Sequence, residues 1–265
     1  MGFLRSDASV VQLGRWAQDE DEPYLGVAVA LSSGHTLASL SGAYGFVRFV
    51  LRNDLTAQTM RSDYGTITFN GMGGFTEMSD RHQVTWNGVP TPKTSYSGNG
   101  MYLVANNGEV TIVGGGGQGA VSRDLEFVFW VRQSCPEVEM VLAVRLPQPA
   151  GPTFVDGDWR LCSTEVDVST SALDSDWGTI ALSPLTPTGG SLTPTLFRIS
   201  TVSTPSGTTT TTPSVVPDSY TLGAGGSIAL FSQGVQRRPV PGWVSSDGSM
   251  LVGAPSLPSV GSSPG

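Results

Sequence analysis

The residue types that carry enzyme and metal chemistry are few in this sequence and lie far apart. His35 and His82 are the only histidines, and neither has a partner at the spacing of a metal site or a nucleophile and base pair. We expect both at the surface. The GxSxG, HExxH and EF-hand patterns are absent. The sequence therefore predicts no catalytic residue, no metal site and no cofactor, and a protein that is not an enzyme.

Two further features could suggest ligands, but a simpler reading of each is favoured. The glycine run Gly114–Gly119 lacks the following helix that a phosphate loop needs, so we expect a hairpin turn. The acidic residues at 19–22, together with Asp174 and Asp176, are more typical of solvated loops than of a calcium site.

The cysteines and the repeated aromatic residues leave two alternatives open. Cys135 and Cys162 belong to no CxxC motif, and either a disulfide or two buried thiols would suit them. Aromatic residues at equivalent places in the repeat described below favour core packing. The alternative is a ligand pocket inside a barrel. Its candidate residues are Tyr44, Trp159, Tyr64, Trp177, Trp86 and Trp130.

Composition and charge narrow the function further. The net charge is −8, Lys93 is the only lysine and the arginines are scattered, which argues against nucleic acid as a partner. No apolar run approaches the ~20 residues of a membrane span. With 34 glycines, 18 prolines and only 14% charged residues, the chain suits a β-rich fold with many turns.

The most informative pattern is an internal repeat of roughly 115 residues. Leu40–Phe46 matches Val155–Leu161, Ser62–Ile67 matches Ser175–Ile180, and Tyr102–Val110 matches Tyr220–Ile228. A fourth block, Val121–Asp124, recurs near both ends of the chain as Leu4–Asp7 and Val244–Asp247. The segment that follows it, Val138–Leu146, resembles Pro23–Leu31 but has no third copy.

These matches predict four parts. Residues 1–31 are a partial repeat of terminal strands, and residues 32–147 are a complete unit. Residues 148–256 are a second unit that lacks its last strand, and residues 257–265 are a flexible tail. The Thr/Pro/Gly-rich stretches 184–190 and 203–217 are expected to be exposed loops within the second unit.

Runs rich in β-branched and aromatic residues, such as Phe46–Leu51 and Glu126–Val131, predict about eight strands per unit. Asn70-Gly71 and Asn107-Gly108 favour tight hairpins between them. We therefore predict an all-β chain of two tandem antiparallel up-and-down barrel-like units, with an extra N-terminal strand pair. Two-sheet sandwiches are the alternative.

The order of four motifs carries a resemblance. SGxY at Ser41–Tyr44 is followed by GTxTF at Gly65–Phe69, YxVxxxG at Tyr102–Gly108 and VSxD at Val121–Asp124. This order resembles tandem calycin-like or β-meander modules of bacterial exported proteins. The resemblance implies a fold, and an extracellular or cell-envelope location, rather than an activity.

The missing strand suggests a function. An unclosed barrel exposes two strand edges, and the strand Tyr24–Leu31 repeats the missing element. We expect it to complete the second unit, within the chain or from a neighbouring molecule or another β-protein. Its residues are Tyr24, Leu25, Val27, Val29 and Leu31. The predicted role is structural or binding, with a small-molecule carrier or a virion or appendage subunit as alternatives.

Overall fold

The structure is a computed structural model. It describes all residues except 1, 5–9, 16–23, 55–56, 86–92, 135, 148–154, 168–171, 187–188, 203–207, 212–216, 233–239 and 254–265. For some strand residues only the backbone is described. The predicted flexible tail, residues 257–265, therefore lies outside the described residues. The acidic cluster at 19–22 lies outside them too.

The first unit is a closed eight-stranded barrel in which each strand pairs antiparallel with its neighbours in sequence. The last strand pairs with the first and closes the barrel, with Leu142 opposite Val47. This architecture confirms the predicted up-and-down barrel. The strands are β4 (Ser41–Asp54), β5 (Ala57–Asn70), β6 (Gly74–Thr85), β7 (Thr94–Val104), β8 (Glu109–Val113), β9 (Gly117–Val121), β10 (Phe127–Ser134) and β11 (Glu137–Arg145).

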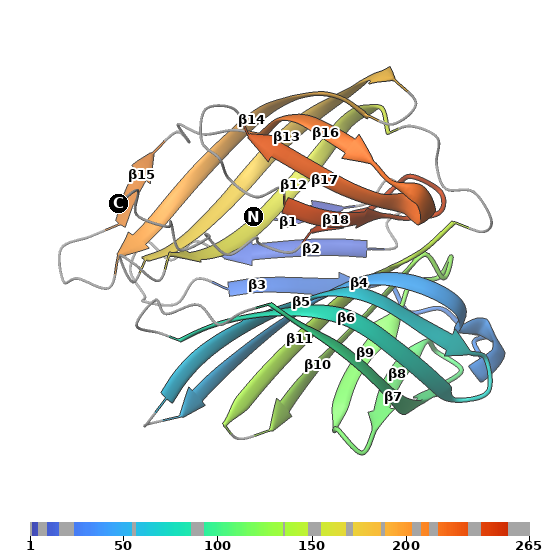
Figure 1. The fold of residues 1–265 in the computed structure, drawn as a ribbon. Coiled ribbons are helices and arrows are strands. Elements are labelled where there is room, and N and C mark those ends of the chain that lie inside the picture. Colours follow the sequence, from blue (N-terminus) through green and yellow to red (C-terminus); the bar gives the residue numbers. More distant parts are fainter. Residues whose placement is uncertain are drawn as a thin grey trace.

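The second unit is a curled sheet that follows the same strand order without closing (Figure 1). Its path is β12, β13, β14, β16, β17, β18 and β19, and β15 pairs with β14 beside this path. The bounds are β12 (Gly157–Asp167), β13 (Ala172–Thr186), β14 (Gly189–Val202), β15 (Thr208–Thr211), β16 (Pro217–Leu222), β17 (Ser227–Ser232), β18 (Val240–Val244) and β19 (Leu251–Gly253).

The two Thr/Pro/Gly-rich stretches are in part strands, which corrects the prediction that they are loops. Most of 184–190 belongs to the paired ends of β13 and β14, and Thr208–Thr211 forms β15. Threonine is β-branched, and this explains why a threonine run joins a sheet edge when a neighbouring strand offers one.

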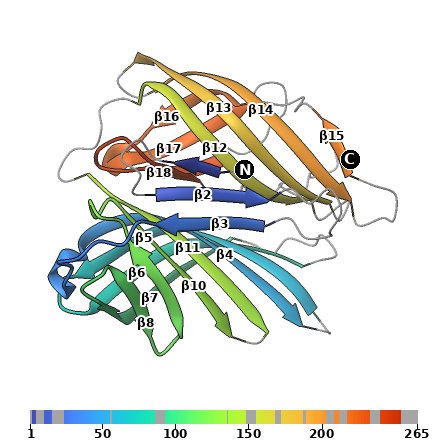
Figure 2. The same cartoon turned by 180° about the vertical axis from the view of Figure 1, so that it is seen from behind.

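The N-terminal strands form a separate antiparallel sheet of β1 (Gly2–Leu4), β2 (Val10–Arg15) and β3 (Tyr24–Val29). It has one strand more than the predicted pair. Two opposite views place this sheet between the barrel and the curled sheet (Figures 1 and 2). Among the β3 side chains that the structure describes, Val27 and Val29 pack against a hydrophobic cluster shared by the two units.

The repeat is visible in individual hydrogen bonds. The Tyr102 hydroxyl donates to the Leu40 carbonyl at 2.6 Å, and the equivalent Tyr220 hydroxyl donates to the Val155 carbonyl at 2.8 Å. In each unit this bond ties the start of the first strand to the wall, since Leu40 and Val155 are equivalent positions. The shared tyrosines are therefore core residues that anchor a loop.

The VSxD block forms the same turn in both units. The Ser122 hydroxyl bonds Asp124 at 2.6 Å and accepts the Phe127 amide at 2.9 Å. Ser245 likewise bonds Asp247 at 2.6 Å and accepts the Met250 amide at 2.9 Å. These Ser and Asp side chains satisfy backbone N–H groups where the ladder is interrupted, and this explains why the motif recurs.

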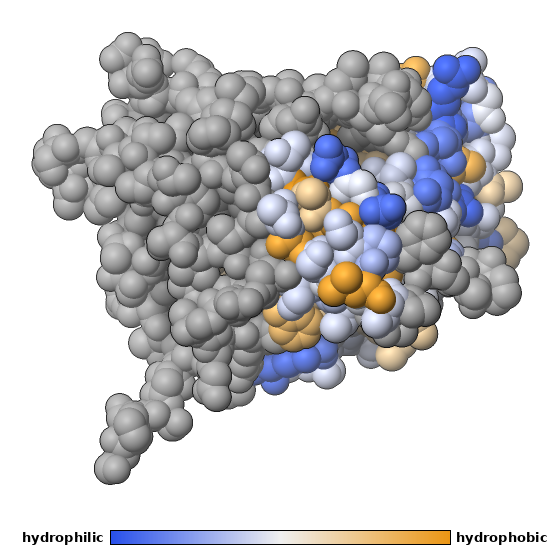
Figure 3. Space-filling view, turned by 90° about the horizontal axis from the view of Figure 1, so that it is seen from above, coloured by the Kyte–Doolittle hydropathy of each residue, from blue (hydrophilic) through white to orange (hydrophobic). Residues whose placement is uncertain are grey.

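Three hydrophobic clusters hold the described parts together. One fills one half of the barrel and includes Tyr44, Phe69 and Trp130, and another lies on the curled sheet around Tyr220. The third joins the two units, because Trp243 of β18 packs on the outer face of the barrel. Figure 3 shows hydrophobic residues scattered among hydrophilic ones on the described part of the face seen from above.

Candidate functional site

The six aromatic residues considered for a ligand pocket do not gather in one place. Tyr44 and Trp130 lie inside the barrel, where both are almost fully buried. Tyr64 lies on the outer face and stacks on Trp243, with ring centroids 5.0 Å apart. Trp159 packs against the core of the curled sheet. Trp86 lies outside the described residues, and of Trp177 only the strand position is described.

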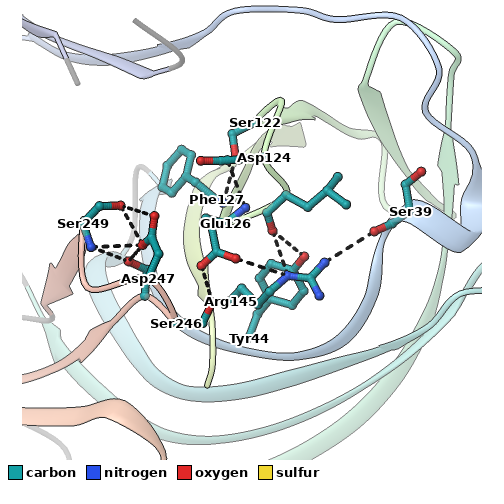
Figure 4. Close-up of polar contacts among 12 residues, drawn as sticks. Ser39, Tyr44, Ser122, Asp124, Glu126, Phe127, Arg145, Ser246, Asp247 and Ser249 are labelled. Atoms are coloured by element: carbon teal, nitrogen blue, oxygen red, sulfur yellow. Dashed lines mark hydrogen bonds and ion pairs between the residues drawn. The ribbon is translucent and has the colours of Figure 1, made fainter. Parts of the chain in front are cut away.

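Inside the barrel, the half nearest the β5–β6 hairpin is filled by aromatic packing. Phe69 makes edge-to-face contacts with Tyr44 at 5.4 Å and Tyr102 at 5.0 Å between ring centroids. The Tyr44 hydroxyl donates to the Leu125 carbonyl at 2.8 Å (Figure 4). Burial raises the pKa of Tyr44 above its usual value, against the opposing effect of Arg145. This half of the lumen is a packed core.

The other half of the lumen holds a cluster of charged side chains. Arg48 of β4 lies at its centre and is 7% exposed. Its guanidinium donates to both carboxylate oxygens of Glu77, at 2.7 and 2.6 Å, and to Asp63 at 3.0 Å. Its Nε lies 3.7 Å from Glu139. A charge buried in this way is tolerated only because several opposite charges surround it.

The wall positions these groups by simple strand geometry. Along β4 the side chains of Tyr44, Phe46 and Arg48 alternate with outward ones, so all three point into the lumen. The same alternation carries Asp63 of β5 and Glu77 of β6 inward. Arg48 and Asp63 lie midway along β4 and β5, and Glu139 lies near the β10–β11 connection.

Three further arginines surround the cluster. Arg61 Nε lies 3.1 Å from Asp63, Arg81 Nε lies 3.5 Å from Asp63, and Arg132 lies 3.4 Å from Glu139. Arg132 also approaches Glu137 at 3.6 Å. Burial by itself would lower the pKa of Arg48, but the hydrogen bonds with Glu77 and the nearby carboxylates raise it above its usual value. Arg48 is therefore permanently charged.

A half-open cavity of about 300 Å³ lies against this cluster. Its wall is largely polar, and the apolar residues Phe75, Ile112 and Trp130 form the remainder. The Arg81 guanidinium stacks on the Tyr96 ring, 3.4 Å from its centroid. The volume is at the lower end of the range found for small-molecule sites, so the cavity suits a small polar ligand.

Sequence reasoning missed this cluster, although a signal was present. Each arginine or carboxylate reads as a solvated surface charge when it is taken alone. Arg48, however, stands two residues after Phe46 and two before Val50 in a strand whose alternate residues are core. This spacing puts the guanidinium on the same face of the strand as Phe46 and Val50.

The second structural feature of functional interest is the unclosed edge of the curled sheet. In the barrel, β11 pairs with both β10 and β4. In the described part of the curled sheet, β12 pairs with β13 alone and β19 with β18 alone. The strand β3, the sequence counterpart of β11, pairs with β2 and with no other described strand.

The residues of the predicted assembly strand are placed as follows. Tyr24, Leu25, Val27 and Val29 belong to β3, and Leu31 follows it with 52% of its surface exposed. The side chains of Tyr24 and Leu25 are not described. The proposed disulfide lies outside the described residues, because Cys135 does.

The curled sheet is fastened to the barrel by polar as well as apolar contacts. Ser246, in the turn after β18, donates its hydroxyl to Glu126 at 2.6 Å (Figure 4). Its amide donates to the Arg145 carbonyl at 2.8 Å. These bonds accompany the stacking of Trp243 on Tyr64, so the junction combines specific geometry with burial.

Two expectations for the chemistry-bearing residues can be compared with the structure. His35 is buried, which corrects its expected surface position: its Nε2 lies 2.7 Å from the Ser32 hydroxyl and its amide donates to the Asn106 carbonyl. The side chain of His82 is not described. The glycine run forms the predicted hairpin turn between β8 and β9, with positive φ at Gly114 and Gly116.

Over the described residues, no group of three or more His, Cys, Asp or Glu side chains is placed to hold a metal ion. The same part of the chain contains no helix with the length and apolar character needed to cross a membrane. No protein-family model, curated protein or solved structure matches the chain.

Proposed function

We propose that this protein is a non-enzymatic structural subunit that assembles by strand addition, with β3 of one copy pairing along β12 of a neighbouring copy. We place it outside the cell or in the cell envelope. A subunit of a virion or of a surface appendage is a variant of the same role. Assembly is the role that best uses an unclosed repeat whose missing strand exists elsewhere in the chain.

One observation carries the proposal, namely the difference between the two units at equivalent edges. The first strand of the barrel, β4, is covered along its free side by β11, from Glu137 to Arg145. The equivalent edge of β12 has no partner among the described strands. An exposed edge of this length is a template for pairing with another chain.

The strand β3 suits this edge for three reasons. It matches β11 in sequence, it is already a strand, and one of its sides is free of described partners. In the barrel the order is β9, β10, β11, β4, and in the N-terminal sheet it is β1, β2, β3. Addition of β12 to the free side of β3 would reproduce the barrel order without disturbing β2.

The barrel also supplies the register. Leu142 of β11 lies opposite Val47 of β4. Since both strands recur at an offset of 115 residues, the equivalent pair is Val27 of β3 and Cys162 of β12. Each ladder hydrogen bond contributes only about 0.5–1.5 kcal/mol, so several residues in register are needed for a stable contact.

A carrier of apolar small molecules is supported less well. The apolar half of the barrel lumen is filled by its own side chains, including Tyr44, Phe69 and Tyr102. Empty space in the barrel lies instead beside the charged cluster. An apolar ligand there would leave buried charges without water or partners.

Solution mass tests the proposal. We expect light scattering to show a mass that rises with concentration for the full chain. A synthetic peptide of residues 22–31, added in excess, should compete for β12 and lower that mass. The control peptide carries aspartate in place of Val27 and Val29, which should leave the mass unchanged. A monomer at every concentration would contradict the proposal.

A further inference from the structure

The charged cluster in the barrel has more hydrogen-bond donors than acceptors. Four arginines carry about twenty N–H groups, whereas the carboxylates of the cluster only accept. Three of those carboxylates, Asp63, Glu77 and Glu139, lie close to Arg48. Four arginine nitrogens of the cluster, but only one described carboxylate oxygen, Asp63 Oδ1, are buried without a partner, so the surplus lies on the arginine side.

The structure shows where this surplus is found. The Nε atoms of Arg48, Arg61, Arg81 and Arg132 are buried and have no hydrogen-bond acceptor. Arg61 Nε is within ion-pair range of Asp63, at 3.1 Å, but its N–H does not point at the oxygen well enough to bond it. Buried donors without acceptors are uncommon and need an explanation.

All four arginines line the half-open cavity of about 300 Å³. Three of them, Arg61, Arg81 and Arg132, keep roughly a quarter of the side chain exposed, at 22, 24 and 28%. These guanidiniums can be reached from solvent while their inner ends are held by the cluster. Such fixed guanidiniums bind oxyanions well, because their N–H groups are already oriented.

We propose that this open end of the barrel binds a small oxyanion, a carboxylate or phosphate group, through Arg61, Arg81 and Arg132. Glu137 and Glu139 prevent an excess of positive charge when the site is empty, and the oxyanion accepts from the outer N–H groups of the three arginines, because their Nε atoms are buried. Arg81, stacked on Tyr96, is held at the cavity wall. This site is independent of the proposed assembly through β3.

The test is the thermal unfolding of the full chain in sodium phosphate, sodium succinate and sodium chloride at equal ionic strength. We expect a saturable rise of the unfolding midpoint in at least one of the first two, beyond that in chloride. A response to phosphate alone identifies a phosphate site, and a response to succinate alone a carboxylate site. Equal midpoints in all three salts would overturn the proposal.

A variant comparison separates binding from a general salt effect. Arg132→Gln removes donors of the site and should weaken the apparent affinity about tenfold or more. Arg123→Gln is the matched control, because Arg123 is exposed on the turn after β9, at the other end of the barrel. Arg81→Gln replaces Arg132→Gln if circular dichroism shows that the latter does not fold. An unchanged affinity in the site variant would also overturn the proposal.

Discussion

Replacement of Arg48 by methionine should be among the most destabilising single changes in the barrel. The guanidinium contacts Glu77, Asp63 and Glu139 at distances of 2.6–3.7 Å and is 7% exposed. Removal of one member of a buried ionic cluster leaves the opposite charges uncompensated, which typically costs about 3–5 kcal/mol. Asp63 and Glu139 retain ion pairs with other arginines, so most of the lost stability comes from Glu77, which is left without a cationic partner among the described residues.

This reasoning predicts strong coupling between Arg48 and Glu77. The double variant Arg48→Met/Glu77→Met removes the pair as a unit and should be destabilised by less than the sum of the two single variants. Urea unfolding followed by circular dichroism gives the free energies, with the exposed Arg123→Met as control, for which about 0.5 kcal/mol or less is expected. The reasoning is refuted if Arg48→Met and Arg123→Met have equal stability.

Three further predictions concern the junction and the repeat. A Cβ on Gly45 would clash with the Trp243 ring, so Gly45→Ala should displace that ring, lower stability by about 1–3 kcal/mol and change tryptophan fluorescence; unchanged spectra would contradict this. Burial, with a smaller effect of Asp80, raises the pKa of Tyr64 to about 12, above ~10 in the unfolded chain. The stability that this shift contributes to the folded state is therefore fully present below pH 10 and is lost as the pH rises to 12. Urea unfolding across that range should show a smaller alkaline loss for Tyr64→Phe than for the wild type. Tyr102→Phe and Tyr220→Phe each remove the hydroxyl bond to an equivalent carbonyl, and Tyr102→Phe also removes a longer one to the Leu37 carbonyl at 3.3 Å. Each variant should cost about 1–2 kcal/mol in thermal or urea unfolding, and a much larger cost for Tyr220→Phe would argue against equivalent roles.

The fold could be predicted from local signals. Runs of β-branched and aromatic residues in β4 and β10 are typical of strands, and the Asn-Gly pairs give positive φ at Gly71 and Gly108. The repeat then showed which strands are equivalent, and the shared bonds of Tyr102 and Tyr220 agree with that alignment. These features depend on neighbours in sequence or on the offset between copies.

The charged cluster could not be assembled in the same way. Arg48, Asp63, Glu77 and Glu139 come from four strands, and their contacts depend on registers that no local pattern specifies. His35 was misjudged for a similar reason, since its burial depends on the distant loop at Asn106. Long-range register, rather than residue type, limits what such a sequence reveals.

The most direct test of strand addition is a crosslink in the predicted register. Val27→Cys, in a Cys135→Ser background, places one thiol opposite Cys162 of the strand β12 that β3 is proposed to join. Ala28→Cys in the same background is the matched control, because adjacent residues of a strand point to opposite faces. After mild oxidation, the account predicts disulfide-linked dimers and larger species for Val27→Cys on a non-reducing gel, and few for Ala28→Cys. Monomers alone, or equal crosslinking of both variants, would contradict it.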